Sequence, residues 1–216
     1  MARRKKEPQS NHRKNIAEAA QRLFAAKGIE STSMNEIAKE SGYSKATLYV
    51  YYKDKEELVG VLVLESMQKL YDYLSRALED VGDVSECFHR ICSAFVDYQE
   101  EYPFYFKMAL ESINIDFETT RFLPEEKETF LIGERINALF IDFFEQGIRS
   151  GSFREELEVF PTIFAMWGMI SGVILLSVNK QEYIAMQMKK TKREFLEQGF
   201  DLLYQSILSE KERGRK

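Results

Sequence analysis

Residues 41–58 read SGYSKATLYVYYKDKEEL, and the turn and cap residues in this stretch predict how the chain begins to fold. Gly42 is typical of the end of one helix, and a new helix can begin at Ser44 or directly after it. That helix must end near Lys53, because Asp54 stands as an N-cap before the acidic first turn of another helix. The stretch therefore predicts a very short helix between two others.

The residues before this stretch predict two further helices. Apolar residues recur with the helical period over about residues 11–27, and Gly28 follows as a C-cap. The periodic positions are Ile16, Ala20, Leu23 and Phe24. Ser33 and Glu36 have the spacing of a capping box, which opens a second helix that stops at Gly42. Two short helices joined by a glycine-bearing turn form a helix-turn-helix.

About residues 11–60 resemble, nearly without gaps, the DNA-binding domain of the TetR family of bacterial transcriptional regulators. The matching positions are Ala19, Leu23, Phe24, Gly28, Thr32, Ser33, Met34, Ile37, Ala38, residues 42–49, Tyr51, Tyr52 and residues 55–58. Relatives often have glycine where Ala46 stands and His-Phe where Tyr51 and Tyr52 stand. The methyl group of Ala46 can restrict a close approach of the backbone to phosphate.

The resemblance implies an all-α protein, in which an N-terminal three-helix DNA-binding domain is followed by a larger helical ligand-binding and dimerisation domain. It also implies which side chains meet the duplex. The DNA-binding candidates are Ser33, Ser44, Lys45, Ala46, Thr47, Tyr49, Tyr51 and Lys55. For Ser33 the alternative is a helix cap with no role in DNA binding, and both roles can hold at once.

Helical spacing divides the side chains of the short helix between core and solvent. Leu48 and Tyr52 are four residues apart and can face the first two helices, while Lys45, Thr47 and Tyr49 can face outward. Thr47 and Lys45, near the helix start, are placed for base edges, whereas hydroxyl groups and the helix N-terminus suit phosphate oxygens. For the tyrosines the alternative is plain core packing.

Charge is distributed unevenly along the chain. Residues 1–53 hold 11 lysines and arginines against 5 acidic residues, while the rest holds 19 against 30. A basic head on an acidic body favours contact with a polyanion at one end, although a short basic tail alone gives part of the same signal. The expected domains are a flexible basic arm (1–10), the helix-turn-helix domain (11–54), the ligand-binding and dimerisation domain (55–210) and a flexible basic tail (211–216).

The cysteines and the N-terminus indicate a cytoplasmic protein. Cys87 and Cys92 are the only two cysteines, so neither a disulfide framework nor a four-ligand zinc site can be built from them. The basic N-terminus leads into an amphipathic segment rather than an apolar one, unlike a secretory signal.

The remainder, about residues 56–210, reads as helices separated by a few turns. Turns are expected at residues 82–83, 102–103, 123–124, 149–152 and 179–180. Residues 98–167 hold 15 of the chain's 28 aromatic residues, which either fill a helical core or line an apolar ligand cavity such as the resemblance implies. The candidate pocket residues are Tyr98, Tyr105, Phe106, Glu111, Asn114, Phe140, Phe144, Phe164 and Trp167.

Catalytic and metal signatures are weak. Glu86 and His89 have the Glu-x-x-His spacing of a di-iron helix, but the only other histidine is His12, so a second copy of the motif is impossible. The common phosphate-binding loops and the nucleophile elbow of hydrolases are missing from the sequence. We therefore expect no enzyme activity, no metal and no cofactor.

Residues 159–178 read VFPTIFAMWGMISGVILLSV and contain no charge over 20 positions, which is the length of a membrane-spanning helix. Its proline and hydroxyl residues and the absence of a basic flank favour a buried subunit interface instead. Gly168 and Gly172 form a G-x-x-x-G pattern that lets helices approach closely. The expected dimer-interface residues are Gly168, Gly172, Phe195, Phe200 and Leu203.

Together these patterns predict a homodimeric transcriptional regulator without membrane contact. We expect a repressor that binds a near-palindromic double-stranded DNA operator and is released by a small, largely apolar effector. The alternative is a helical ligand carrier or membrane-associated protein whose basic head binds anionic surfaces.

Overall fold

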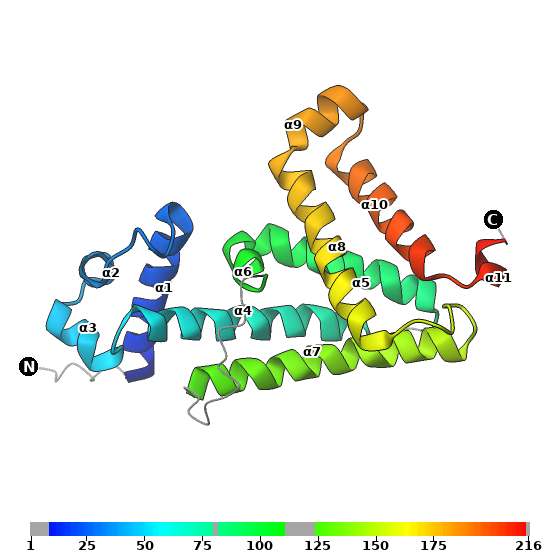
Figure 1. The fold of residues 1–216 in the computed structure, drawn as a ribbon. Helices are drawn as coiled ribbons and strands as arrows, with labels where there is room; N and C mark the ends of the chain where they lie inside the picture. The colour runs from blue at the N-terminus through cyan, green and yellow to red at the C-terminus, as the bar shows by residue number, and fades with distance from the viewer. Residues whose placement is uncertain (1–8, 80–81, 111–123, 215–216) are drawn as a thin grey trace, which may run out of the picture. The chain divides into compact units, whose positions relative to one another are not determined.

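The structure is a computed structural model that describes residues 9–79, 82–110 and 124–214. Within these residues the regular structure is helical throughout, and the only β-type pairing is an isolated bridge between Phe153 and Leu208. The predicted all-α class is confirmed (Figure 1). The expected basic arm lies mostly outside the described residues, whereas the expected tail begins within the short helix α11 (Glu210–Arg213).

The chain divides into two compact units. The first comprises Met1–Ser66 and Lys107–Thr129, and the second comprises Met67–Phe106 and Phe130–Lys216. The chain passes between them inside three helices, α4, α6 and α7, so neither unit is one continuous stretch. The domain limits expected at residues 54 and 210 stay predictions.

The first unit contains the helices of the predicted head. These are α1 (Gln9–Lys27), α2 (Met34–Ser41), α3 (Lys45–Tyr51) and the first half of α4 (Lys55–Ala77). Their apolar faces bury one core, formed by Ile16, Ala20, Phe24, Ile37, Leu48, Tyr52, Leu58 and Leu62. Helix α3 ends before Lys53, because Tyr52 adopts an extended backbone and Asp54 begins the next helix by accepting a hydrogen bond from the Glu57 amide.

The second unit contains the rest of α4 and the helices that follow. They are α5 (Val84–Glu101), most of α6 (Pro103–Met108), most of α7 (Pro124–Arg149), α8 (Val159–Asn179), α9 (Gln181–Tyr183), a π-helical turn (Ile184–Met188), α10 (Lys192–Ile207) and α11 (Glu210–Arg213). The predicted turns at residues 102–103, 149–152 and 179–180 are confirmed. The turn predicted at residues 82–83 is also confirmed, because both residues precede α5 and Asp83 caps it. Of the pair 123–124 only Pro124 is described, and it begins α7.

One break in the second unit lies outside the predicted turns. Helix α10 begins after Lys189, a non-glycine residue in the left-handed region (φ 54°), and Thr191 caps it through a capping box with Glu194. Helices α8 and α10 run side by side and form a hairpin with α9 at its tip (Figure 1). They pack closely where a Cβ atom built at Gly199 would lie 2.7 Å from Cγ1 of Val173.

Candidate nucleic-acid interface

Two hydrogen-bonded caps build the helix-turn-helix. The Ser33 hydroxyl accepts from the Glu36 amide while the Glu36 carboxylate accepts from the Ser33 amide, so the predicted capping box is present. At the other end of α2, Gly42 has φ 76° and donates its amide to the Ala38 and Lys39 carbonyls. Because this left-handed conformation strains other residues, glycine is required to turn the chain from α2 into α3.

Glu36 is also held as a charged group. Lys27 donates to its carboxylate, and the amide and hydroxyl of Ser33 donate as well, which together lower the pKa of Glu36 to about 2. The ion pair joins the end of α1 to the first turn of α2. The Glu36 side chain therefore both closes the cap of α2 and links α2 to α1.

Helix α3 is a two-faced element. Leu48 is fully buried and Tyr52, the residue after the helix, is 1% exposed, whereas Tyr49 is 45% exposed and Val50 is 77% exposed. This confirms the predicted division of the helix between core and solvent. Its outward face carries Lys45, Ala46, Tyr49 and the half-buried Thr47, joined by Val50, which the sequence reasoning did not select.

The first turn of α3 has a pre-formed hydroxyl pair. The Ser44 hydroxyl accepts from the Thr47 amide at 3.1 Å, and the two side-chain oxygens lie 2.8 Å apart. Lys45 places its ammonium group 5.9 Å from the Tyr49 ring centroid. Within about one and a half turns of helix, these side chains therefore present two hydroxyl groups, one cation and one aromatic ring.

Three other predicted DNA-binding residues have additional contacts inside the head. Ser33 serves as the cap of α2, and Tyr51 is half-buried, with its ring centroid 5.5 Å from that of His12. The Lys55 ammonium donates to the Ile29 carbonyl at 2.9 Å, so this lysine also ties α4 to the turn after α1. The DNA-contact role proposed for each stays a prediction.

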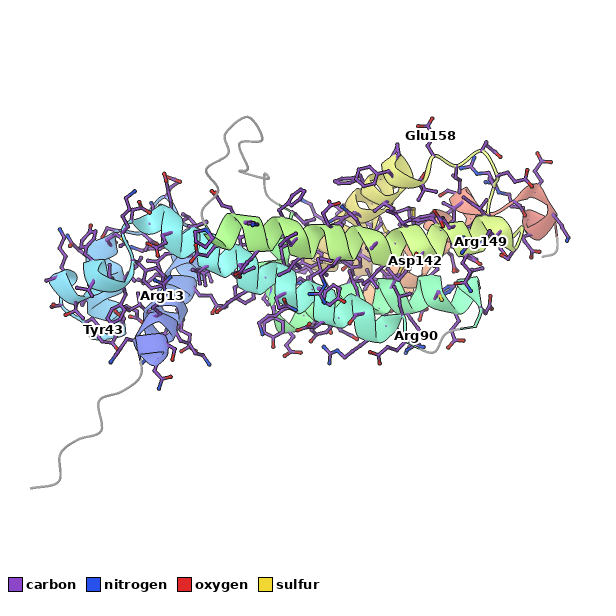
Figure 2. The ribbon with its side chains drawn as sticks, turned by 90° about the horizontal axis from the view of Figure 1, so that it is seen from below. Arg13, Tyr43, Arg90, Asp142, Arg149 and Glu158 are labelled. Atoms are coloured by element: carbon purple, nitrogen blue, oxygen red, sulfur yellow. The ribbon has the colours of Figure 1, made fainter. Side chains whose placement is uncertain are left out.

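Two residues that sequence reasoning did not select lie close to this region. His12 has Nδ1 2.7 Å from the Tyr43 hydroxyl, and the Arg13 guanidinium reaches the end of α3. Arg13 and Tyr43 both lie in the N-terminal unit among the first helices (Figure 2). The local sequence gave little signal for them, because their partners are more than thirty residues away.

The sequence over this region matches a known family model. Residues 16–62 match the model of bacterial regulatory proteins of the tetR family. This stretch is a TetR-family helix-turn-helix. Its match to the HTH-type transcriptional regulator TtgR of Pseudomonas putida has 37% identity over 84 residues, 39% of this chain and 40% of that protein. The chain thus spans about two fifths of the length of this curated relative.

Longer matches are weaker. The uncharacterized HTH-type transcriptional regulator YhgD of Bacillus subtilis is 24% identical over 144 residues, which is 67% of this chain and 73% of that protein. The crystal structure of the TetR-family transcriptional regulator PfmR of Thermus thermophilus superposes with a TM-score of 0.65 and 27% identity, covering 88% of this chain and 96% of that one. The family fold therefore extends beyond the helix-turn-helix.

Most of the predicted pocket aromatics are buried in the second unit. Tyr98, Tyr105, Phe106, Phe140 and Phe144 are buried. Trp167 is half-buried, with its ring centroid 5.9 Å from that of Phe95. The structure places Phe164 elsewhere: it is 51% exposed and pairs with Phe160 on the outer side of α8. Glu111 and Asn114 lie outside the described residues.

Two hollows in the described parts of the chain lie away from that cluster. One, of about 660 Å³, is lined by residues 178–183 and Ala185, and another, of about 490 Å³, is lined by Arg13, Lys53, Asp54, Glu56, Glu57, Pro124 and Glu125. Both are open and mostly polar or charged. The role of the aromatic residues as pocket walls stays a prediction.

The outer side of α8 is apolar and exposed. Phe160, Phe164, Met169 and Leu176 are each at least 39% exposed. A Cβ atom built at Gly168 or at Gly172 would have no neighbour within 4 Å. Among the other predicted interface residues, Phe200 is buried against the chain itself, while Phe195 and Leu203 are half-buried.

Helix α8 also has the length and apolar composition of a membrane-spanning helix, and 28% of its most apolar window is buried inside the chain. Across the described residues, no three histidine, cysteine, aspartate or glutamate side chains gather as metal ligands. His89 instead contacts the Ser85 carbonyl at 2.7 Å and lies 3.6 Å from Asp201.

Proposed function

We propose that this TetR-family protein is a DNA-binding transcriptional regulator that reads the major groove with α3. The observation that carries the proposal is the two-faced α3, whose buried face is fixed by Leu48 and Tyr52 and whose other face presents Lys45, Thr47 and Tyr49 to solvent. A helix held in this way can enter the major groove, because the groove is wide enough for one.

The chemistry of the exposed face supports the same proposal. Thr47 and Lys45 lie in the first turn of α3, from which recognition helices contact base edges. The Ser44 hydroxyl and the exposed Tyr49 suit phosphate or sugar oxygens, which set the register of the helix on DNA. The excess of positive charge in residues 1–53 would strengthen binding to any duplex.

We further propose a homodimer that binds a near-palindromic operator. The support is the exposed apolar side of α8, because large exposed apolar surfaces of soluble proteins mark interaction sites. A two-fold interface uses the same patch on both copies and would present two copies of α3 to two half-sites. Gly168 and Gly172 would allow the two α8 helices to approach closely.

The regulatory mode that we propose is repression relieved by a small, largely apolar effector. The buried aromatic cluster of the second unit supports this mode, since apolar side chains line most small-molecule sites. Helix α4 follows α3 directly and carries the chain from the first unit into the second, so a ligand bound in the second unit could act on α3 through it. By reciprocity, an effector that weakens DNA binding must itself bind the DNA complex less tightly.

Selection of bound fragments from a genomic library at moderate salt tests the proposed function. We expect enrichment of a sequence with two related half-sites, followed by salt-sensitive binding that prefers this sequence over a scrambled duplex. Binding that is equal on both duplexes, together with binding to anionic vesicles, would instead support the membrane-associated alternative. We test this alternative because α8 has the length and apolar composition of a membrane-spanning helix.

A further inference from the structure

Arg13 on α1 contacts the residues at which α3 ends. Its Nη1 donates to the Tyr51 carbonyl at 2.6 Å, and its guanidinium carbon lies 4.3 Å from the centroid of the Tyr52 ring. In return, the Tyr52 hydroxyl donates to the Arg13 carbonyl at 3.0 Å. Backbone and side chain of one α1 residue therefore hold the last turn of α3 from two directions.

The same guanidinium also reaches the start of α4. Arg13 Nη2 lies 3.2 Å from Oε1 of Glu57, whose other oxygen accepts from the Lys53 amide at 2.7 Å. The contacts thus run from the Tyr51 carbonyl through Arg13 and Glu57 to the Lys53 amide. They enclose Tyr52, the single residue between those two backbone groups. We call this set, Arg13, Tyr51, Tyr52, Lys53 and Glu57, the α3 clamp.

A second carboxylate approaches the clamp from α7. Glu125, in the first turn of α7, has Oε1 3.5 Å from Arg13 Nη2, the same nitrogen that contacts Glu57. Its Cβ lies 3.9 Å from the position that a Cβ on Gly60 of α4 would take, so the first turn of α7 packs near α4 here. All these residues belong to the first unit, while α7 continues into the second.

We propose that Arg13 is the positioning residue of the recognition helix, and that Glu125 adjusts how firmly the α3 clamp is held. The inference rests on the proposed DNA-reading role of α3. Arginine suits this position because its planar group can donate to a carbonyl and a carboxylate while lying over an aromatic ring. Lysine keeps the charge but lacks that fork, so it cannot make all the contacts together.

The test compares full-length Arg13→Lys and Glu125→Gln with the wild type and with Glu128→Gln. The last variant removes the same charge from the same helix at an exposed position outside the clamp. Two quantities are measured: the ratio of affinities for the selected operator and a scrambled duplex, and amide hydrogen exchange in the peptide that covers residues 48–57. Thermal unfolding reports whether each variant is folded.

We expect Arg13→Lys to lower the affinity ratio by about 5-fold or more, the range of one misplaced base contact, and to speed exchange at the α3–α4 junction. Glu125→Gln should shift both quantities in the same direction by a smaller factor, and Glu128→Gln should leave both unchanged. If Arg13→Lys unfolds the first unit, the comparison of Glu125→Gln with Glu128→Gln becomes the test, because Glu125→Gln keeps Arg13 in place.

Other results would overturn the inference. Wild-type exchange and a wild-type affinity ratio in Arg13→Lys would show that the clamp does not position α3. Equal losses on both duplexes with unchanged exchange would make Arg13 a phosphate ligand instead. Identical behaviour of Glu125→Gln and Glu128→Gln would remove Glu125 from the device. If the wild type selects no sequence, the proposed function fails, while the exchange measurement still decides whether the clamp exists.

Discussion

Thr47 is the residue on which we expect sequence discrimination to depend most directly. Its hydroxyl lies on the outward side of the first turn of α3, 2.8 Å from the Ser44 hydroxyl. Thr47→Ala removes the hydroxyl but keeps the amide that Ser44 caps, so the helix should stay formed. We expect the preference for the operator to fall by about 1 to 3 kcal/mol, the range for a base-edge contact.

Titrations on operator and scrambled duplexes measure this preference. Thr47→Ser is the matched control, because it keeps the hydroxyl. Lys55→Ala should weaken binding to both duplexes by a similar factor if its ammonium meets a phosphate. An unchanged operator preference in Thr47→Ala would show that other residues of α3 carry the readout.

Glu36 gives the head a dependence on pH. Its ion pair with Lys27 and its hydrogen bonds from Ser33 lower its pKa to about 2, below the ordinary value of 4.5. The unfolded chain therefore takes up the proton first as the pH falls, so the stabilisation is complete above the ordinary value and is lost as the pH falls through the lowered one.

The pH dependence can be measured by denaturant unfolding of wild type and Glu36→Gln at several values between about pH 6 and pH 3. We expect the wild type to be the more stable at the upper end and the difference to narrow toward the lower end. A difference that is constant over this range would show that the Glu36 charge does not stabilise the fold.

The sequence predicted burial or exposure correctly for residues whose position on a helix face follows from local spacing. Leu48 and Tyr49 could be assigned to opposite faces because consecutive helical positions differ by a fixed angle. Arg13 could not be found in this way, since its partners lie at the end of α3 and the starts of α4 and α7. Phe164 was expected in a pocket because the number of aromatic residues in a segment does not show which way each side chain points. The structure shows that Phe164 is exposed on α8.

At the scale of elements, α8 offers a test of the dimer. Gly172→Leu should cost little within the chain, because nothing lies within 4 Å of the added Cβ atom and leucine favours helix more than glycine does. If the two copies meet along this face, the larger side chain should weaken their association by about 1 to 3 kcal/mol at each site. Analytical ultracentrifugation measures the dimer dissociation constant.

Gly199→Ala is the contrasting variant. Its added methyl would lie 2.7 Å from Val173 Cγ1, so it should disturb the packing of α10 on α8 and lower the melting temperature of the chain itself. A wild-type dimer in Gly172→Leu would place the interface away from this face. Partition of the wild type into membranes would point to the lipid-associated alternative for α8.

Helix ends could be predicted where caps are local. The capping box of Ser33 and the glycine turn at Gly42 were read from the sequence and confirmed. The start of α10 carries an equally clear pattern in Thr191 and Glu194, which the sequence analysis did not use. The π-helical turn before it (Ile184–Met188) has no such local signature, since no side chain caps its start.

For the whole molecule, the sequence predicted the fold class and the family through residues 11–60, where local patterns are dense. Binding of DNA, of a second copy or of an effector depends on surfaces formed by residues that are distant in the sequence. Local sequence patterns do not show these surfaces. The outer side of α8 shows this limit: its apolar composition alone fits a core, a membrane and an interface equally well, and its exposure in the structure excludes the first.

Operator geometry tests the molecule as a dimer. Two copies of α3 held by one interface can bind two half-sites only when these lie on the same side of the duplex, about 34 Å or a multiple of it apart. Inserting about five base pairs between the selected half-sites turns one of them by about half a helical turn. We expect affinity to fall to that of a single half-site.

Inserting about ten base pairs restores the side of the duplex but lengthens the spacing by about one full turn. A rigid dimer should bind this site poorly as well, whereas a dimer whose heads adjust should regain part of its affinity. Electrophoretic titrations of the three operators with the full chain distinguish these cases. Affinity that is indifferent to both insertions would mean that each copy binds alone, since independent heads need no fixed spacing, and the proposed dimeric repressor would then be wrong even if α3 reads DNA as we propose.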